Sequence, residues 1–317
     1  MQLNQNQVQD ALPWQPLIDA LRTMFTRDVV SPIRHHHTLS VPESPDATLL
    51  LMPAWLPGEY LGVKQVNVFP GNSAKNLPGL SSNYLLSCGQ TGQLLAQIDG
   101  NELTARRTAA ASALASSYLS REDSRTMLMV GAGRVARRLI PAHMSVRPLD
   151  TIHIWDINQA AAKQLATELR DRGINASACT DAELESVARE ADLISCATLS
   201  TTPIIKGAWL KPGAHLDLVG SFTPTMREAD NEAMQRAALF VDVKAAALVE
   251  TGELILPIQD GAIDESHILA GFAELCSGAH TGRAALAAPD TAITAFKSVG
   301  DSREDLAAAV LAYQQMA

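Results

Sequence analysis

One stretch of the chain, residues 126–158, restricts the fold more than any other. An apolar run, Thr126–Val130, leads into the turn at 131–136, which reads GAGRVA. A second apolar run, Thr151–Trp155, then ends on Asp156. A strand that enters a glycine-rich turn, continues as a helix and is followed by a second strand and an acid is typical of a dinucleotide-binding βαβ unit. The stretch therefore predicts a Rossmann domain, and with it an α/β fold built on a doubly wound parallel sheet.

The residues of the turn fit the binding of a diphosphate. Gly131 permits a tight turn, Gly133 lets the backbone approach a pyrophosphate, and Ala136 lets the helix pack closely on the strand. The diphosphate would lie at the helix N-terminus, where free N–H groups and the positive end of the helix dipole favour anions. We therefore expect the whole turn to bind the cofactor: Gly131, Ala132, Gly133, Arg134, Val135 and Ala136.

Asp156 bears on which dinucleotide is bound. It lies twenty positions after Ala136, where a carboxylate can accept hydrogen bonds from the adenosine ribose hydroxyls. Its charge would repel a 2′-phosphate, and the following Ile157 and Asn158 supply no cation. These residues favour NAD(H), while Arg134 in the phosphate region keeps NADP(H) as the alternative.

Strands and helices continue to alternate after this unit. We predict strands at 174–179, 193–197, 215–219 and 239–243, and helices at 182–190 and 228–237. Thr198 follows one of these strands and is expected to face the nicotinamide half of the cofactor. Glu253, beside the apolar segment 254–258, is expected to be a solvated loop acid.

The first 101 residues show the shorter periodicity of an antiparallel sheet. We predict strands at 29–39, 47–52 and 60–69, and a hairpin of 84–87 with 94–98. A helix at 102–119 would lead into the nucleotide domain, and a helix at 301–313 would return to the first domain. We therefore expect a β-rich substrate-binding and dimerisation domain built from residues 1–120 with 290–317, and a Rossmann domain at 121–289.

Composition excludes several other classes of function. The net charge is −9 and aromatic residues make up 4% of the chain, which argues against nucleic acid and anionic membranes as partners. The four cysteines form no C-x-x-C pair and the first residues are polar, so we expect a cytoplasmic protein.

His35 and His37 would share one face of a strand but lack a recognisable third ligand, so no metal is expected. One histidine of the run 35–37 is expected to line the substrate cleft.

In their order along the chain, several short motifs resemble the ornithine cyclodeaminase/μ-crystallin family. The resemblance covers nearly the whole sequence. It rests on PIR at 32–34, GVK at 62–64, LTARRTAA at 103–110, VGAG at 130–133, GAH at 213–215, VGS at 219–221, READ at 227–230 and FKSVG at 296–300.

The resemblance implies a homodimer and a set of ligand-binding residues. By motif, Arg34, Lys64 and Arg107 correspond to the family's substrate contacts, with Lys64 and Arg107 as the catalytic pair. The chemistry is consistent, because arginine binds a carboxylate through two parallel hydrogen bonds and lysine can relay a proton. The resemblance also adds Val219, Gly220 and Ser221 to the cofactor site.

Phe222 is the main departure from the family pattern. Ornithine cyclodeaminase has a catalytic aspartate at this place, and phenylalanine cannot act as a base. The sequence therefore resembles the Δ1-pyrroline-2-carboxylate reductase branch. This implies NAD(P)H-dependent hydride transfer to Δ1-pyrroline-2-carboxylate, or to Δ1-piperideine-2-carboxylate, giving L-proline or L-pipecolate.

Three other functions stay open at this point. Two are enzymes of the same family, ornithine cyclodeaminase and alanine dehydrogenase. The third is of a different class, a non-catalytic crystallin-like protein that binds a cofactor or ligand. The presence of both Lys64 and Arg107 speaks against it.

Overall fold

The computed structural model describes all residues 1–317 apart from the side chain of Ser73. The chain forms two compact units, one of residues Met1–Arg107 with Asp301–Ala317 and one of residues Thr108–Gly300. Helix α3 (Gly100–Leu119) passes from the first unit to the second, and α11 (Ser302–Met316) belongs to the first. None of the described helices combines the length and the apolar character needed to cross a membrane.

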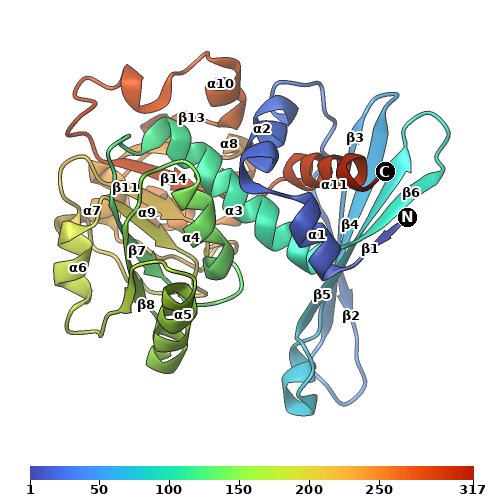
Figure 1. Cartoon of the computed structure of the whole chain (residues 1–317), viewed down its shortest axis with the longest axis horizontal. Helices are drawn as coiled ribbons and strands as arrows, with labels where there is room; N and C mark the ends of the chain where they lie inside the picture. Colours follow the sequence, from blue (N-terminus) through green and yellow to red (C-terminus); the bar gives the residue numbers. More distant parts are fainter. The chain divides into compact units, whose positions relative to one another are not determined.

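The unit of residues 108–300 contains an eight-stranded parallel sheet (Figure 1). Its order is β13-β12-β14-β11-β10-β7-β8-β9. The strands are β7 (Thr126–Val130), β8 (Thr151–Trp155), β9 (Ala176–Ala178), β10 (Leu193–Cys196), β11 (His215–Leu218), β12 (Ala238–Val241), β13 (Ile268–Ala270) and β14 (Thr294–Lys297). The predicted α/β class with a Rossmann-type sheet is confirmed.

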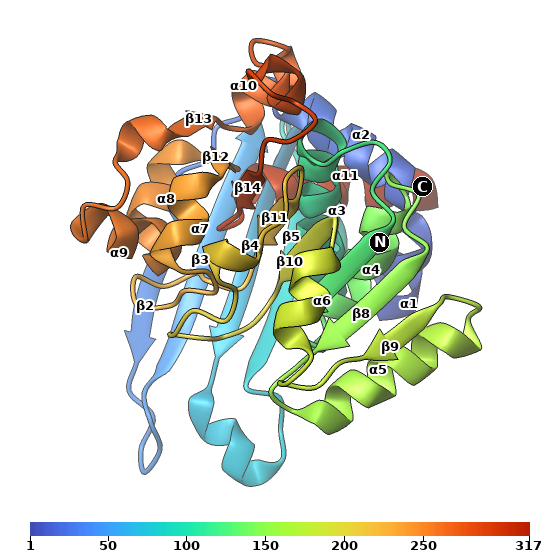
Figure 2. The same ribbon diagram turned by 90° about the vertical axis from the view of Figure 1, so that its left-hand side faces the viewer.

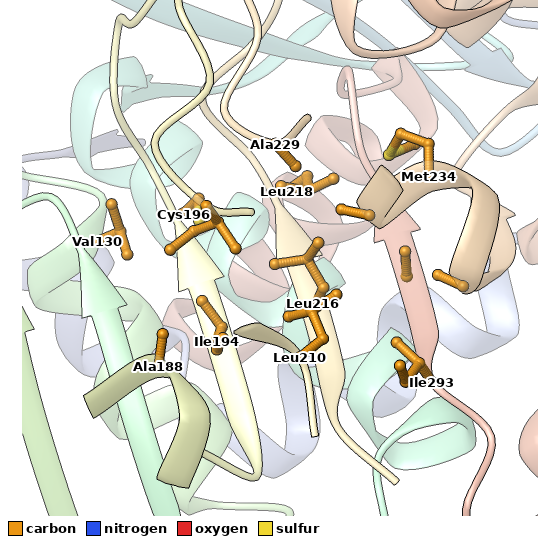
Figure 3. Close-up of a cluster of buried hydrophobic side chains, with 14 of the residues drawn as sticks. Val130, Ala188, Ile194, Cys196, Leu210, Leu216, Leu218, Ala229, Met234 and Ile293 are labelled. Atoms are coloured by element: carbon orange, nitrogen blue, oxygen red, sulfur yellow. The ribbon is translucent and has the colours of Figure 1, made fainter. Parts of the chain in front are cut away.

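Helices cover both faces of this sheet, as the alternation along β11 shows. Leu216 and Leu218 belong to a buried apolar cluster with Ala188 of α6 and Met234 of α7 (Figure 3). Asp217 points to the other face, where it meets His143 of α4. The helices are α4 (Ala136–Met144), α5 (Gln159–Asp171), α6 (Leu184–Glu190), α7 (Asn231–Arg236), α8 (Lys244–Glu250), α9 (Gly252–Gln259) and α10 (Phe272–Ser277), and α5 lies beside β9 in Figure 2.

The first unit is a six-stranded sheet with helices on one face (Figure 1). Its order is β1-β6-β5-β4-β3-β2, antiparallel except for the pair β1 and β6. The strands are β1 (Gln2–Leu3), β2 (His35–Leu39), β3 (Ala47–Leu56), β4 (Tyr60–Val68), β5 (Leu80–Cys88) and β6 (Leu94–Asp99), and the helices are α1 (Gln5–Ala11), α2 (Trp14–Met24) and α11. Helix α11 packs across β3, β4, β5 and β6, so the end of the chain covers a sheet made by its beginning.

Three local predictions differ from the structure. The strand expected at 29–39 is confined to β2, with one isolated bridge from Val30 to Trp55, because Pro32 between them has no N–H to donate. The helix expected from residue 228 begins at Asn231, capped by the side chain of Asp230. Residues 290–300 were predicted to belong to the first domain, but they contain β14, which lies between β11 and β12. This short apolar run is hydrogen-bonded on both sides within the parallel sheet.

Candidate functional site

The glycine-rich turn follows β7 at the edge where the parallel strands end. Gly131 has a φ of 110°, and a Cβ atom there would lie 2.8 Å from the carbonyl oxygen of Ala197. Its N–H donates to the carbonyl oxygen of Trp155 at 2.7 Å. Glycine is therefore required at this position by the fold itself.

Gly133 has no such steric reason to be glycine. A Cβ atom built on it would meet no heavy atom within 4 Å. The residue is exposed and lies just before α4, whose first N–H groups have no partner within the helix. This open approach to a helix N-terminus fits a diphosphate, as the sequence predicted.

Asp156 is held against the same turn. Its two carboxylate oxygens accept hydrogen bonds from the N–H groups of Ala132 and Asn158, both at 2.7 Å. The structure thus brings together the acid and the glycine turn that were predicted to bind one cofactor. Arg134 and Ile157 are exposed beside them, and contact of Asp156 with a ribose stays a prediction.

Two further predicted cofactor residues, Thr198 and Gly220, are joined by one buried carboxylate that the sequence analysis did not select. Glu228 accepts hydrogen bonds from the Thr198 N–H at 2.7 Å, the Thr198 hydroxyl at 2.8 Å and the Gly220 N–H at 2.7 Å. A Cβ atom on Gly220 would lie 2.0 Å from the carbonyl oxygen of Thr198. The loops that follow β10 and β11 therefore touch, and Glu228 fixes their spacing.

The neighbours of Glu228 form a buried polar network. Glu253 accepts hydrogen bonds from the N–H groups of Glu228 and Ala229, and Lys297 donates to the carbonyl oxygen of Leu218 at 3.0 Å. Burial raises the pKa of Glu253 to about 7, although the charge of Lys297 opposes the rise. The expectation that Glu253 is a solvated acid is wrong, because α9 places it in the interior beneath the strand ends.

Ser221 and Val219 are less available to a ligand than the sequence suggested. The Ser221 hydroxyl is buried and bonded to the carbonyl oxygen of Met226 and to the hydroxyl of Thr251. The Val219 N–H donates to the carbonyl oxygen of Cys196 at 2.8 Å. Any contact of these two residues with the cofactor would therefore use other atoms, while Phe222, 52% exposed, is open to a ligand.

In the other unit, the structure brings Lys64 and Arg107 together around one carboxylate. Asp305 lies 2.7 Å from the Lys64 ammonium and 2.8 Å from Nε of Arg107. Glu304 bonds Nη1 of Arg107 at 2.6 Å. Lys64 and Arg107 are only 2% and 6% exposed, and the two acids are fully buried. We call these four side chains the carboxylate–cation cluster.

Burial and charge act in opposite directions within the carboxylate–cation cluster. Burial lowers the pKa of Lys64 to about 8, against the opposing charge of Asp305, and the charges of Arg107 and Arg34 lower it further. For Asp305, burial is outweighed by Arg107 and Lys64, which lower the pKa of its carboxyl group. Lys64, Arg107 and Asp305 are therefore ionised at neutral pH, and Lys64 can lose its proton in mildly alkaline solution.

Arg106 shows that adjacent arginines on α3 have different roles. Its Nε donates to the carbonyl oxygen of Leu12 at 2.9 Å, and its guanidinium lies 4.2 Å from the centre of the Trp14 ring. These contacts hold the connection between α1 and α2 against α3. Arg107, one residue later, points instead to the start of α11.

We expect Gly133→Ala to weaken NADH binding by on the order of tenfold or more, because the added methyl group would stand where the diphosphate meets the backbone, and hydrogen bonds to charged groups contribute about 1.5–3 kcal/mol each. The unfolding midpoint should stay near that of the wild type, since the methyl group meets no protein atom. Fluorescence titration with NADH and urea unfolding would measure the two effects.

Gly131→Ala is the matched control. Its Cβ atom would approach the Ala197 carbonyl oxygen at a strained φ, so we expect a loss of about 1–3 kcal/mol in the free energy of unfolding. A Gly133→Ala protein that binds NADH as tightly as the wild type would contradict the diphosphate assignment.

Comparison with known proteins identifies the family of this chain. The model of the ornithine cyclodeaminase/mu-crystallin family matches residues 1–317. An uncharacterized protein of Schizosaccharomyces pombe is 51% identical over 98% of this chain and 96% of its own length. A Δ1-pyrroline-2-carboxylate reductase of Paracoccus denitrificans is 37% identical over 91% of this chain and 92% of its own length.

A solved structure gives the same result. The Δ1-pyrroline-2-carboxylate reductase of Thermococcus litoralis, in complex with NADH and L-proline, superimposes with a TM-score of 0.90 at 33% identity, covering 99% of this chain and 97% of that chain. The resemblance found in the sequence motifs is thus confirmed, and the chain belongs to the ornithine cyclodeaminase/μ-crystallin family.

Proposed function

We propose that this protein reduces a cyclic imine bearing a 2-carboxylate, with NADH as the hydride donor. The substrate would be Δ1-pyrroline-2-carboxylate, or the six-membered Δ1-piperideine-2-carboxylate, and the product L-proline or L-pipecolate. The observation that carries the proposal is the carboxylate–cation cluster, which holds two cations in a buried, fixed arrangement.

The site presents several cations to a substrate carboxylate. Lys64 and Arg107 are balanced by Asp305 and Glu304, and Arg34 adds a further positive charge that acts on Lys64. Donors also remain, since Lys64 has three N–H bonds and Nη2 of Arg107 has no hydrogen bond among the described residues.

The reaction adds a hydride to the imine carbon and a proton to the imine nitrogen. NADH supplies the hydride when it is bound. Lys64 is the proposed proton donor, because a pKa of about 8 leaves it mostly protonated at neutral pH and able to give up the proton. Arg34 and Arg107 would hold the carboxylate, so that the ring is oriented before the transfer.

Phe222 supports simple reduction over a deaminating cyclisation. It stands in an exposed loop after β11, where the cyclodeaminases of the family carry an aspartate. A phenyl ring cannot accept protons from a substrate amine. NADH is the proposed cofactor over NADPH because Asp156 lies against the glycine turn and its neighbour Ile157 is 88% exposed and uncharged.

Loss of NADH absorbance on addition of Δ1-pyrroline-2-carboxylate would test the proposal. Parallel reactions with NADPH, with Δ1-piperideine-2-carboxylate and with pyruvate plus ammonia would distinguish the cofactor, the ring size and an amino-acid dehydrogenase. We expect oxidation of NADH with the cyclic imines alone. Oxidation only with pyruvate and ammonia would refute imine reduction and favour alanine dehydrogenase.

The pH dependence should report on Lys64. The protonated ammonium is the active form, so kcat/KM should fall as the pH rises through about 8. In Asp305→Asn the carboxylate that raises the pKa of Lys64 is absent. The alkaline limb of the pH–activity profile should therefore shift to lower pH by roughly one unit or more.

Glu304→Gln is the control for this experiment. Glu304 bonds Arg107 and is not among the largest influences on the pKa of Lys64, so its loss should move the limb less than the loss of Asp305 does. An alkaline limb at the same pH in the wild type and in Asp305→Asn would rule out Lys64 as the titrating group.

We further propose that the protein is a homodimer that associates through the open face of the six-stranded sheet. The residues on this face are paired across strands, with Val63 opposite both Pro53 and Leu85. Leu61 and Leu85 on this face are 36% and 42% exposed. Apolar side chains at the centre of a sheet face are typical of a protein interface.

We expect Leu85→Glu to convert the dimer to a monomer, because a charge at the centre of the apolar face would lose its hydration on association. Light scattering after size-exclusion chromatography measures the mass. Val249→Glu, which replaces an exposed apolar residue on α8, should leave the dimer intact. A Leu85→Glu protein that is still dimeric would place the interface elsewhere.

A further inference from the structure

The three consecutive histidines of β2 divide between the two faces of the sheet. His36 is paired with Leu50 of β3, and Leu50 is paired with Val66 of β4. Directly paired residues of neighbouring strands share a face, and so do residues two apart on one strand. Val66 follows Lys64 by two positions, so His36 lies on the face that carries Lys64.

His35 and His37 lie on the opposite face. They pair with Leu51 and Leu49, and their rings meet edge to face with centroids 6.5 Å apart. All three histidines are exposed. The sequence could not say which histidine faces the substrate, and the strand register selects His36.

Arg34 links His36 to the carboxylate–cation cluster. Burial, and then the positive charge of Arg34, lower the pKa of His36. The same arginine acts on Lys64. The positive charge of Arg34 therefore acts on both His36 and Lys64. His36 is neutral at pH 7 and so keeps one N–H donor without adding charge to the site.

We propose that His36 is a substrate-binding residue that donates a hydrogen bond to the substrate carboxylate beside Arg34. This inference rests on the proposed function, which places a 2-carboxylate at the cations of this face. A carboxylate has about four acceptor positions, so a neutral imidazole N–H can bind it together with the cations. The exposed ring on an edge strand can be reached by a small molecule, and the paired backbone of β2 fixes its position.

The test compares leucine variants at the three histidines. His36→Leu should raise KM for Δ1-pyrroline-2-carboxylate on the order of tenfold, the effect of one lost hydrogen bond to a charged group, and leave KM for NADH unchanged. His36→Gln, whose amide can also donate, should recover most of the loss. His35→Leu and His37→Leu, one residue away on the other face, should change neither constant by more than about twofold.

Binding of pyrrole-2-carboxylate, measured by calorimetry on the protein saturated with NAD⁺, separates this inference from the proposed function. Weaker binding in His36→Leu than in His37→Leu supports the role of His36 even if the wild type reduces no cyclic imine. Equal binding in these two variants overturns it, even if the wild type is an active reductase. A wild type that does not bind the analogue overturns it as well.

Discussion

The carboxylate of Asp305 is the contact on which the substrate side of this protein depends. It joins Lys64 of β4 and Arg107 of α3 to the start of α11, so residues far apart in the chain meet at one group. Buried ion pairs contribute little net stability, because removing charges from water costs about as much as their attraction returns. The value of this cluster lies in orientation: each cation is held on one side by a carboxylate, and its remaining donors are directed before any ligand arrives.

Glu228 has the same kind of role in the nucleotide-binding unit. A single buried carboxylate accepts from two loops that follow neighbouring strands, at Thr198 and Gly220. Because these N–H groups are bonded within the protein, they stay at a fixed spacing in the absence of a cofactor. Each unit therefore uses a buried acid, Asp305 or Glu228, to hold residues that were assigned to ligand binding. A reductase that needs a fixed geometry for hydride transfer gains from such preorganisation.

Local patterns in the sequence predicted the α/β class and the glycine turn, and the resemblance to the family singled out Lys64. The same patterns failed for acids whose burial depends on distant contacts. Glu304 and Asp305 open a helix with the segment SRED, which reads as a solvated first turn, and Glu253 reads as a loop acid. Their partners lie far away in the chain, so no local pattern reveals their burial. Strand β14 was not predicted, because its four residues, which end in the buried Lys297, are too few to show the periodicity of a strand.

The central claim is that the carboxylate–cation cluster receives the substrate carboxylate. A crystal structure of the protein with NADH and L-proline bound tests it most directly. The account predicts that the proline carboxylate lies within hydrogen-bond distance of Arg34 and Arg107 and the ring nitrogen within hydrogen-bond distance of Lys64, with Asp305 still paired to Lys64 and Arg107. A proline carboxylate bound elsewhere, with Lys64 and Arg107 in contact only with Asp305 and Glu304, would contradict it.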